Sequence, residues 1–553
     1  MAPVEDLRYG LALSGADPAS LTRALGRAFL EASRRPRTVA EALARLSRAQ
    51  VAITFDVARM ALGASGQPGS LDDRRFHDRA WTENPILRCV LESYLAGSRT
   101  AHELLDELEL DEGTRRKASF ALGLLLDAAA PSNLPWVNPT VVKEAYDTGG
   151  RSVVRGARLF LEDLLRNGGQ PSQVDVGAFE LGRNLAATPG CVVFRNHLIE
   201  LLAYEPTTER VHARPILYSP PWINRYYVLD LSPGRSFVEH AVGQGFTVLA
   251  ISYRNPDETM AKLTLDDYLR DGFLAALERT SDLTGSSTVN VVSVCVGGTL
   301  AAIGLGVLAA RGESERIGWA ALFNSLVDYA EPGEIAAFTD EAAIQRIERR
   351  VQRRGYMAPA EISAPFTLMK GNDLIWRYVV SNWLMGKRPE PFDILAWNAD
   401  DVRLPAAMHV QYLRACYLHN LLTHRDALVV DGTPVDMAKI ETPLYVLGAR
   451  DDHIVPWRSS YRTTQLTGGE TRFTLTSGGH IAGLVNPPGK ANARYWTQDP
   501  SPPESDAWLA GAEERQGSWW EDWAAWAAPR SGELTAPPKL PEGEPAPGQY
   551  VRS

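Results

Sequence analysis

The stretch Val291-Val292-Ser293-Val294-Cys295-Val296-Gly297-Gly298-Thr299 decides the fold. Its β-branched apolar run predicts a buried strand that ends at Cys295, two glycines follow in a sharp turn, and Thr299 begins a helical segment. A strand, a tight turn and a helix with a thiol at the turn are the parts of a nucleophile elbow, which exposes a reactive side chain above a parallel sheet. The usual pattern is Gly-x-nucleophile-x-Gly, and here Ser293 replaces the first glycine. The stretch therefore predicts an α/β fold with Cys295 as the nucleophile.

Other interpretations of the same residues are weaker. The charge-free run 290–310 has the length of a membrane-spanning helix, which needs about 20 apolar residues, but its serine, threonine and glycines favour a buried strand and helix. We therefore expect no membrane span. Gly304-Leu305-Gly306 falls inside the predicted helix, so it does not indicate a dinucleotide-binding loop. An isolated cysteine in an apolar run is usually a core residue, so a catalytic role for Cys295 requires a base and an acid elsewhere in the chain.

Length and composition limit the class of protein. With 553 residues, 45% hydrophobic and 22% charged, the chain is expected to be globular, with two domains or one domain carrying a large insertion. A net charge of −10 and the lack of a basic stripe argue against nucleic-acid binding. The four cysteines are widely separated and offer no metal-ligand pairs, so we expect a reducing compartment and no metal site. The first residues lack a basic segment followed by an apolar core, which predicts no signal peptide and a cytoplasmic location.

The pattern of apolar residues divides the chain into two domains. Residues 1–182 have helical spacing and lack long β-branched runs, which predicts a helical N-terminal domain. Residues 183–553 alternate strands with helices, as a mostly parallel sheet does, and form the predicted catalytic domain. The predicted strands are 214–218, 247–253, 289–294, 320–323, 443–447 and 471–475. The aromatic-rich helical interval 328–422 predicts a cap over the active site, and an insertion with a purely structural role is the alternative.

The C-terminal residues have two distinct patterns. Trp519, Trp523 and Trp526 recur at i, i+4 and i+7, which is more typical of a packed amphipathic helix than of a ligand cage. Residues 529–553 are rich in proline and glutamate and predict a tail that is extended over the surface or mobile.

Candidate partners for a cysteine nucleophile follow two of the predicted strands. In α/β-hydrolases the nucleophile, the acid and the histidine come in that order, each on a loop after a strand. Asp451 and Asp452 follow the strand 443–447, and His480, flanked by glycines, follows the strand 471–475. Spacing alone does not distinguish the two aspartates. His453 is a rival base, but it shares the loop of the acids, which favours a structural role.

From about Pro135 to Trp526 the chain resembles a known family through several long motifs. They are Pro220-Pro221-Trp222-Ile223-Asn224-Arg225-Tyr226-Tyr227, Ser252-Tyr253-Arg254-Asn255-Pro256, Cys295-Val296-Gly297-Gly298-Thr299, Asn372-Asp373-Leu374-Ile375-Trp376, Phe392-Asp393-Ile394-Leu395-Ala396-Trp397-Asn398, Asp452-His453-Ile454-Val455-Pro456-Trp457 and Gly479-His480-Ile481-Ala482-Gly483-Leu484-Val485-Asn486-Pro487-Pro488. These motifs resemble those of the polyhydroxyalkanoate synthases, bacterial enzymes that polymerise hydroxyacyl-CoA thioesters into storage polyester. The first hundred residues match poorly, as expected for a family whose N-terminal domain varies.

The resemblance implies an α/β-hydrolase fold with a helical cap, preceded by the helical domain, and a role for particular residues. Cys295 would be the nucleophile, His480 the base, and Asp452, directly before His-Ile-Val-Pro-Trp, the acid. Ala482, two residues after the base, is a position where side-chain size could set the substrate, and Trp376 belongs to the aromatic segment expected to shield the site. The motifs look most like those of single-subunit synthases of short-chain monomers, such as (R)-3-hydroxybutyryl-CoA, whereas the overall length and the C-terminal tail resemble those of the medium-chain synthases.

The resemblance also implies the chemistry and the partners. The oxyanion would be bound by the backbone N–H groups of Val296 and Trp222. No cofactor is needed, since the CoA thioester is the substrate, and the expected partners are the growing polyester chain, the granule surface, granule-coat proteins and a second copy in a homodimer. The family's nucleophile box usually has glycine at position 293, and we expect activity to survive Ser293. The alternatives are a thioesterase or esterase on the same fold, and a non-catalytic granule-associated protein.

Overall fold

The computed structural model describes residues 18–63 and 73–553, which form two compact units. One unit comprises the chain up to Asp175 together with Ser363–Glu390, and the other comprises Val176–Ile362 and Pro391–Ser553. The change of unit after Asp175 lies seven residues before the boundary predicted at 182. The interval 328–422, predicted as a cap within the catalytic domain, is divided between the two units.

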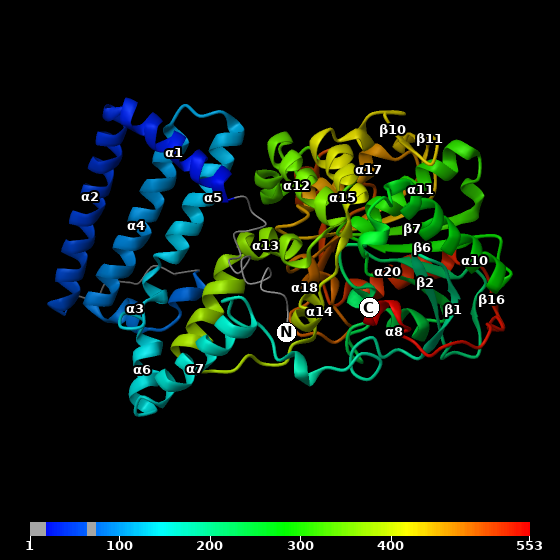
Figure 1. The fold of residues 1–553 in the computed structure, drawn as a ribbon, viewed down its shortest axis with the longest axis horizontal. Coiled ribbons are helices and arrows are strands. Elements are labelled where there is room, and N and C mark those ends of the chain that lie inside the picture. Colours follow the sequence, from blue (N-terminus) through cyan, green and yellow to red (C-terminus); the bar gives the residue numbers. More distant parts are fainter. Residues whose placement is uncertain (1–17, 64–72) are drawn as a thin grey trace. The chain divides into compact units, whose positions relative to one another are not determined.

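The N-terminal unit is built from helices, as the sequence predicts (Figure 1). Asn84, Asp111 and Asn138 each accept backbone N–H groups at the start of a helix, which satisfies donors that have no partner within the helix. The main helices are α1 (Pro18–Arg34), α2 (Pro36–Ala61), α4 (Pro85–Glu107), α5 (Glu112–Ala128), α6 (Pro139–Asp147) and α7 (Arg151–Arg166). Two small apolar clusters hold them together, one of Ala24, Ala28, Leu105, Leu108 and Ala118 and one of Phe76, Trp81 and Leu91.

The segment Ser363–Glu390 packs into this helical unit through η11 (Val379–Leu384). The Trp383 indole N–H donates to the carboxylate of the buried Asp163, 2.7 Å away, and its ring meets Phe160 edge to face with the ring centroids 5.0 Å apart. Gly156 allows this approach, because a Cβ there would lie 2.0 Å from the carbonyl oxygen of Trp383. The aromatic segment therefore packs against the helices of this unit.

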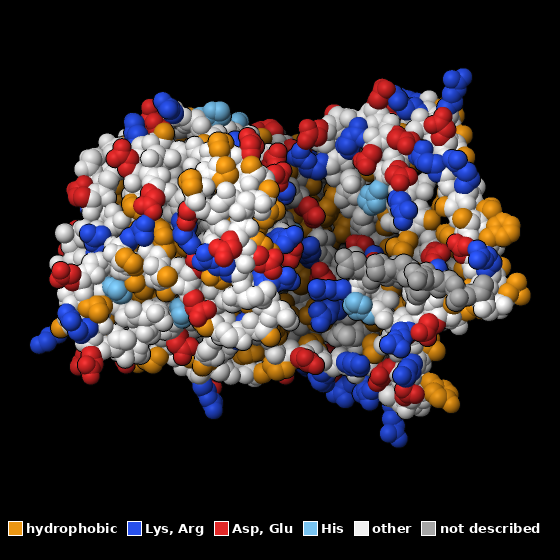
Figure 2. Space-filling model, turned by 180° about the vertical axis from the view of Figure 1, so that it is seen from behind, with side chains coloured by type: hydrophobic (Ala, Val, Ile, Leu, Met, Phe, Trp, Pro, Cys, Tyr) orange, Lys and Arg blue, Asp and Glu red, His pale blue; other side chains and the backbone are white. Residues whose placement is uncertain are grey.

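The helical unit also exposes many large apolar side chains. In α7, Val154 is 72% and Leu165 77% exposed, and in α2 Phe55 is 68% exposed. Figure 2 shows apolar side chains protruding from the helical unit on the right of that view. Large exposed apolar areas on a folded protein usually mark surfaces that bind another apolar surface.

The second unit is organised around a ten-stranded mixed sheet with the order β1-β2-β5-β4-β6-β7-β12-β13-β14-β15. The six strands from β5 to β13 are mutually parallel, and antiparallel strands extend the sheet at both ends. The strands are β1 (Gly190–Arg195), β2 (Ile199–Tyr204), β4 (Ile216–Ser219), β5 (Val248–Tyr253), β6 (Val289–Val294), β7 (Ile317–Phe323), β12 (Leu444–Ala449), β13 (Thr471–Thr476), β14 (Arg494–Thr497) and β15 (Glu513–Gln516). The six predicted strands correspond to the six parallel ones, and the α/β architecture is confirmed.

The run 290–310 is the strand β6 followed by the buried helix α11 (Val296–Arg311). Across residues 18–63 and 73–553, none of the helices combines the length and apolarity needed to cross a membrane. The tryptophan-rich segment is the helix α20 (Trp519–Ala527), whose Trp519 and Trp523 are fully buried. Trp523 contacts the rings of Phe237 and Trp319, so the predicted packed amphipathic helix is confirmed.

The tail beyond Pro529 runs along this unit and returns to it. The short strand β16 (Leu534–Thr535) pairs with β3 (Val211–His212). Further on, Pro545 forms a bridge with Cys191 in the edge strand β1, and the last turn, η16 (Tyr550–Arg552), buries Val551. The structure therefore places the tail as an extended segment with docked ends.

Candidate active site

Cys295 lies at a strained turn between β6 and α11. Its backbone has φ 53° and ψ −130°, a conformation that costs a residue with a side chain about 1–3 kcal/mol and persists only where surrounding contacts enforce it. One such contact is the Cys295 N–H, which donates to the carbonyl oxygen of Phe323 at the end of β7, 2.9 Å away. This is the geometry of a nucleophile elbow, with the thiol carried at the carboxyl end of a central parallel strand.

Gly297 and Gly298 lie so close to neighbouring loops that a side chain would not fit at either position. A Cβ on Gly297 would lie 2.4 Å from the carbonyl oxygen of Pro220, and a Cβ on Gly298 would lie 2.0 Å from the hydroxyl of Ser325. The start of α11 therefore presses against the loops that follow β4 and β7. Ser293 lies within β6, fully buried, and its hydroxyl donates to the carbonyl oxygen of Ala321, 2.9 Å away. Its extended backbone suits any residue, so the turn does not require glycine at this position.

His480 and Asp452 face each other at the ends of the two neighbouring strands β13 and β12. His480 begins the short helix α18 (His480–Leu484), and its Nδ1 lies 2.6 Å from Asp452 Oδ2. The other carboxylate oxygen of Asp452 accepts the N–H groups of Ile454 and Val455, each at 2.9 Å. Asp451, the neighbouring acid, is exposed. The loop thus selects Asp452 as the residue that bonds the imidazole.

The electrostatics of His480 connect it to Cys295. Burial alone would lower the pKa of His480, but the negative charges of Asp452 and Cys295 and hydrogen bonds to both side chains raise it well above its usual value. Because Nδ1 is bonded to Asp452, the contact with the thiol falls to Nε2. The raised pKa favours a proton on the imidazole of His480, beside the sulfur of Cys295.

Two residues near these side chains were not singled out from the sequence. Asn324, at the end of β7, has φ 46° and donates its side-chain N–H to the carbonyl oxygen of His480, 2.5 Å away. Tyr417 lies beside Cys295: its pKa is raised by burial and then by the negative charge of Cys295. Neither residue belongs to a spacing pattern. The one sequence signal is the asparagine directly after a strand, because asparagine adopts positive φ more readily than other residues with a side chain.

Tyr417 belongs to a buried group of aromatic side chains next to the elbow. Its ring meets Tyr329 and Tyr412 edge to face, with centroids 4.8 and 5.6 Å apart. The hydroxyls of Tyr329 and Tyr412 lie 3.1 Å apart, and Tyr329 also bonds the hydroxyl of Thr299, one turn after the nucleophile. These residues supply an apolar surround with a few fixed hydroxyls, which is typical of a ligand site.

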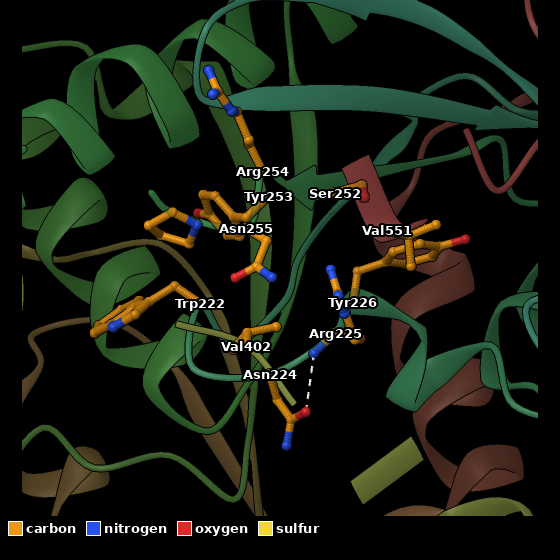
Figure 3. A pocket seen from close by; sticks show the side chains of 11 residues that line it. Trp222, Asn224, Arg225, Tyr226, Ser252, Tyr253, Arg254, Asn255, Val402 and Val551 are labelled. Carbon is orange, nitrogen blue, oxygen red and sulfur yellow. Dashed lines mark hydrogen bonds between the residues drawn. The ribbon is translucent and has the colours of Figure 1, made fainter. Parts of the chain in front are cut away.

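The residues expected to bind the oxyanion are carried by adjoining segments. Val296 is the first residue of α11, and Trp222 lies in the loop after β4, whose Pro220 contacts the start of α11. Trp222 is buried, and its ring meets Tyr412 edge to face at 5.3 Å. A small pocket lies beside this loop, lined by Trp222, Asn224, Arg225, Tyr226, Ser252, Tyr253, Arg254, Asn255, Pro256, Val402 and Val551 (Figure 3).

The two residues suggested for substrate binding lie in different units. Ala482 is exposed on α18, two residues after His480. Trp376 is partly buried at the end of η10 (Asn372–Trp376), which belongs to the helical unit. A hydrogen bond from the Arg75 guanidinium to the side-chain oxygen of Asn372 holds η10 to the rest of that unit. In the described part of the chain, His, Cys, Asp and Glu side chains form no group of three or more that could hold a metal ion.

Comparisons with known proteins bear on the whole chain. Residues 72–241 match the family model described as the poly-beta-hydroxybutyrate polymerase (PhaC) N-terminus, and residues 228–487 match the alpha/beta hydrolase fold. Solved structures similar to this chain include a thermophilic esterase from Thermogutta terrifontis, 15% identical, which covers 53% of this chain and 90% of that one with a TM-score of 0.30. Another is the enol-lactonase from Burkholderia xenovorans, 14% identical, with coverage of 51% and 90% and a TM-score of 0.27.

Curated relatives match over nearly their full length. The poly(3-hydroxyalkanoate) polymerase subunit PhaC of Cupriavidus necator is 44% identical, over 89% of this chain and 85% of the relative. Poly(3-hydroxyalkanoate) polymerase 2 of Ectopseudomonas oleovorans is 41% identical, over 91% and 90%. The poly(3-hydroxyalkanoate) polymerase of Methylorubrum extorquens is 38% identical, over 100% and 94%. The chain therefore belongs to the poly(3-hydroxyalkanoate) polymerase family.

Proposed function

We propose that this polymerase joins (R)-3-hydroxyacyl groups from CoA thioesters through a covalent thioester on Cys295, with release of CoA. The observation that carries the proposal is the alignment of three buried side chains: the strained Cys295 faces His480, and Asp452 holds the far side of the imidazole. A nucleophile, a base and a group that orients the base are the minimum set for acyl transfer by a cysteine.

In the first step the Cys295 thiolate attacks the thioester carbonyl, and the proton that the thiol gave up stays on His480. The tetrahedral intermediate collapses, the C–S bond to CoA breaks, and protonated His480 returns the proton to the departing CoA sulfur. Cys295 then carries the acyl group and His480 is neutral. Backbone N–H groups of Val296 and Trp222 would stabilise the oxyanion, and one such donor typically contributes about 2.7–4 kcal/mol to lowering the barrier.

In the second step neutral His480 takes the proton from the hydroxyl of a second monomer or a chain end. That oxygen attacks the thioester on Cys295, an ester forms, and the sulfur leaves as a thiolate beside protonated His480. The ester product is more stable than the thioester, which drives the transfer. No metal or bound cofactor is needed for either step.

Asp452 acts as the orienting residue in this scheme. One of its oxygens is bonded to His480 and the other accepts two backbone N–H groups, and its side chain is fully buried. Its oxygens already take part in three hydrogen bonds, and the fully buried side chain offers no exposed surface to a substrate hydroxyl. We therefore assign both proton transfers to His480.

Substrate and location form the finer part of the proposal. We propose short-chain monomers such as (R)-3-hydroxybutyryl-CoA, on the similarity of the motifs, with Ala482 and Trp376 as residues that contact substrate. We also propose that the enzyme works as a homodimer at the surface of polyester granules in the cytoplasm, where granule-coat proteins are further partners. The exposed apolar side chains of α2 and α7 support binding to an apolar polyester surface.

The proposal is tested by release of CoA from (R)-3-hydroxybutyryl-CoA, with the product sized. Release that is lost in Cys295→Ala, together with insoluble polyester, is the expected result. Release that yields only the free acid would make this chain a thioesterase. A lack of release from both short-chain and longer hydroxyacyl-CoAs would favour a non-catalytic granule protein, although a strained elbow would serve no purpose there.

A further inference from the structure

The last thirteen residues form a strap across the edge of the catalytic unit. We call residues 541–553 the C-terminal strap. The Val192 N–H donates to the carbonyl oxygen of Glu544, 2.8 Å away, and the Ala546 N–H donates to that of Gly190, 2.9 Å away. The strap thus extends the sheet beside its edge strand β1, which also protects that edge from pairing with another chain.

The strap is fixed further on by a buried carboxylate. Glu200, in β2, is fully buried, and its Oε2 accepts the N–H groups of Gln549 and Tyr550 at 3.1 and 3.0 Å. Gly548 precedes this contact with φ 76°, and a Cβ there would lie 2.4 Å from Glu200 Oε2. The path of the strap is therefore specified by glycine and cannot accommodate a side chain without moving.

The end of the strap holds one residue of the loop that carries Trp222. We call residues 219–226 the oxyanion loop. Its Arg225 is buried, and the guanidinium donates to the main-chain oxygens of Tyr550 and Ser553 at 3.3 and 2.9 Å. The same guanidinium pairs with Asp400, 3.1 Å away. Because a guanidinium is planar and donates in fixed directions, these partners fix the position of Arg225 rather than only its charge.

The strap also forms one wall of the pocket beside this loop. Val551 is only 2% exposed and lines the pocket together with Trp222 and Tyr226. Figure 3 shows Val551 across the pocket from Trp222, with Arg225 on the Val551 side. Trp222 and Arg225 are three residues apart, so a displacement of Arg225 would be transmitted through a short peptide to the Trp222 N–H.

We propose that the C-terminal strap positions the oxyanion loop, so that the Trp222 N–H is held ready for the reacting carbonyl. Arg225 and Val551 are then positioning residues that act through Trp222. The inference rests on the proposed function, because it assigns the strap to the stabilisation of an oxyanion on Cys295. Misplacement of a donor by about 1 Å is enough to weaken this stabilisation.

The experiment compares two reactions of Cys295 in the full chain. Acylation by (R)-3-hydroxybutyryl-CoA forms an oxyanion, whereas alkylation by iodoacetamide needs the thiolate but no oxyanion donor. Val551→Asp places a carboxylate in the buried wall, and Gly548→Ala forces the strap away from Glu200. We expect each variant to acylate at least about tenfold more slowly, up to about 10²- to 10³-fold, the typical effect of losing one oxyanion donor. The alkylation rate should remain within twofold of the parent chain.

Matched controls separate the strap from general effects of substitution. Val551→Ile keeps the apolar wall. Gly285→Ala introduces a methyl group at a similar backbone angle, φ 70°, with open space around it. Both controls should acylate at close to the parent rate.

Each outcome decides the inference. A selective loss of acylation in Val551→Asp and Gly548→Ala supports it. Equal losses of acylation and alkylation overturn it, because the strap would then support the whole unit, and unchanged rates of both reactions overturn it too. If the parent chain is alkylated but releases no CoA from any hydroxyacyl-CoA, the proposed function itself fails, and the inference fails with it.

Discussion

Replacing Asp452 with asparagine tests the role of the buried carboxylate most directly. The amide oxygen can still accept the N–H groups of Ile454 and Val455, so the loop keeps its shape. The amide nitrogen then faces Nδ1 of His480, where the carboxylate oxygen lay at 2.6 Å. Two donors cannot bond each other, so Nδ1 loses its proton and Nε2 keeps one. In that tautomer His480 cannot accept a proton from Cys295.

The size of the effect follows from the interaction that is lost. A hydrogen bond to a charged group contributes about 1.5–3 kcal/mol, which corresponds to a loss of roughly 10- to 100-fold in the rate of acylation. The wrong tautomer adds to this loss, and the same change in serine proteases lowers kcat by about 10⁴-fold, which sets an upper limit. We therefore expect Asp452→Asn to acylate between about 10- and 10⁴-fold more slowly.

The assay is single-turnover acylation of Cys295, with Asp451→Asn as the matched control. Asp451 is the adjacent acid in the same loop, but it is exposed, so its variant should retain the parent rate. The reasoning would be refuted if Asp452→Asn acylated within about threefold of the parent, or if Asp451→Asn were equally slow.

The same variant has a consequence for stability as a function of pH. The pKa of folded His480 is raised well above the value of 6.5 expected for the unfolded chain. Protonated His480 therefore stabilises the fold fully below pH 6.5, and this contribution is lost as the pH rises through the raised pKa. Without the charge of Asp452 the raised pKa falls, so in Asp452→Asn the pH-dependent part of Tm should shrink. A Tm profile that is unchanged from the parent would contradict this assignment.

Three further substitutions have defined outcomes. Gly298→Ala should both destabilise the fold and slow acylation, because the new Cβ would lie 2.0 Å from the Ser325 hydroxyl. Denaturant unfolding measures the loss of stability, and single-turnover kinetics measures the loss of rate. Unchanged stability would contradict the contact. Ser293→Gly should keep the acylation rate within about threefold. It should lower the free energy of unfolding by about 1 kcal/mol, because the buried hydrogen bond to the carbonyl oxygen of Ala321 is removed. A large loss of rate would give Ser293 a catalytic role. Trp383→Phe should lower the free energy of unfolding of the helical unit by about 1–3 kcal/mol, because it removes the hydrogen bond to the buried Asp163. Unaltered thermal unfolding would show that this hydrogen bond does not stabilise the unit.

Local patterns in the sequence were sufficient to predict the strands and turns that carry the candidate site. The β-branched run before Cys295, the glycines after it and the strands before Asp452 and His480 are short-range signals, and each corresponds to an element of the structure. The loops also follow parallel strands, whose carboxyl ends meet at one edge of the sheet, which is why sequence order alone predicted that these segments lie close together.

Other features depend on contacts between distant residues. Spacing left Asp451 and Asp452 equivalent, because their difference arises only when the loop turns one inward to His480. The grouping of Ser363–Glu390 with the N-terminal helices rests on Gly156 beside Trp383, a contact without a local signal. The docking of the strap depends likewise on Glu200, and Asn324 and Tyr417 are single residues whose importance comes from their neighbours.

The division of the helical unit along the chain has a consequence for synthesis. Its helices end before Asp175, but the segment that packs against them, Ser363–Glu390, is translated much later. At about 5–20 residues per second the ribosome needs about 10–40 s to deliver it, and during that time the face of α7 around Gly156 is without its partner. The first unit to be translated is therefore not the first that can finish folding. While the sheet begins to form, the nascent chain therefore carries an incomplete helical unit, whose face around Gly156 still lacks its partner Trp383.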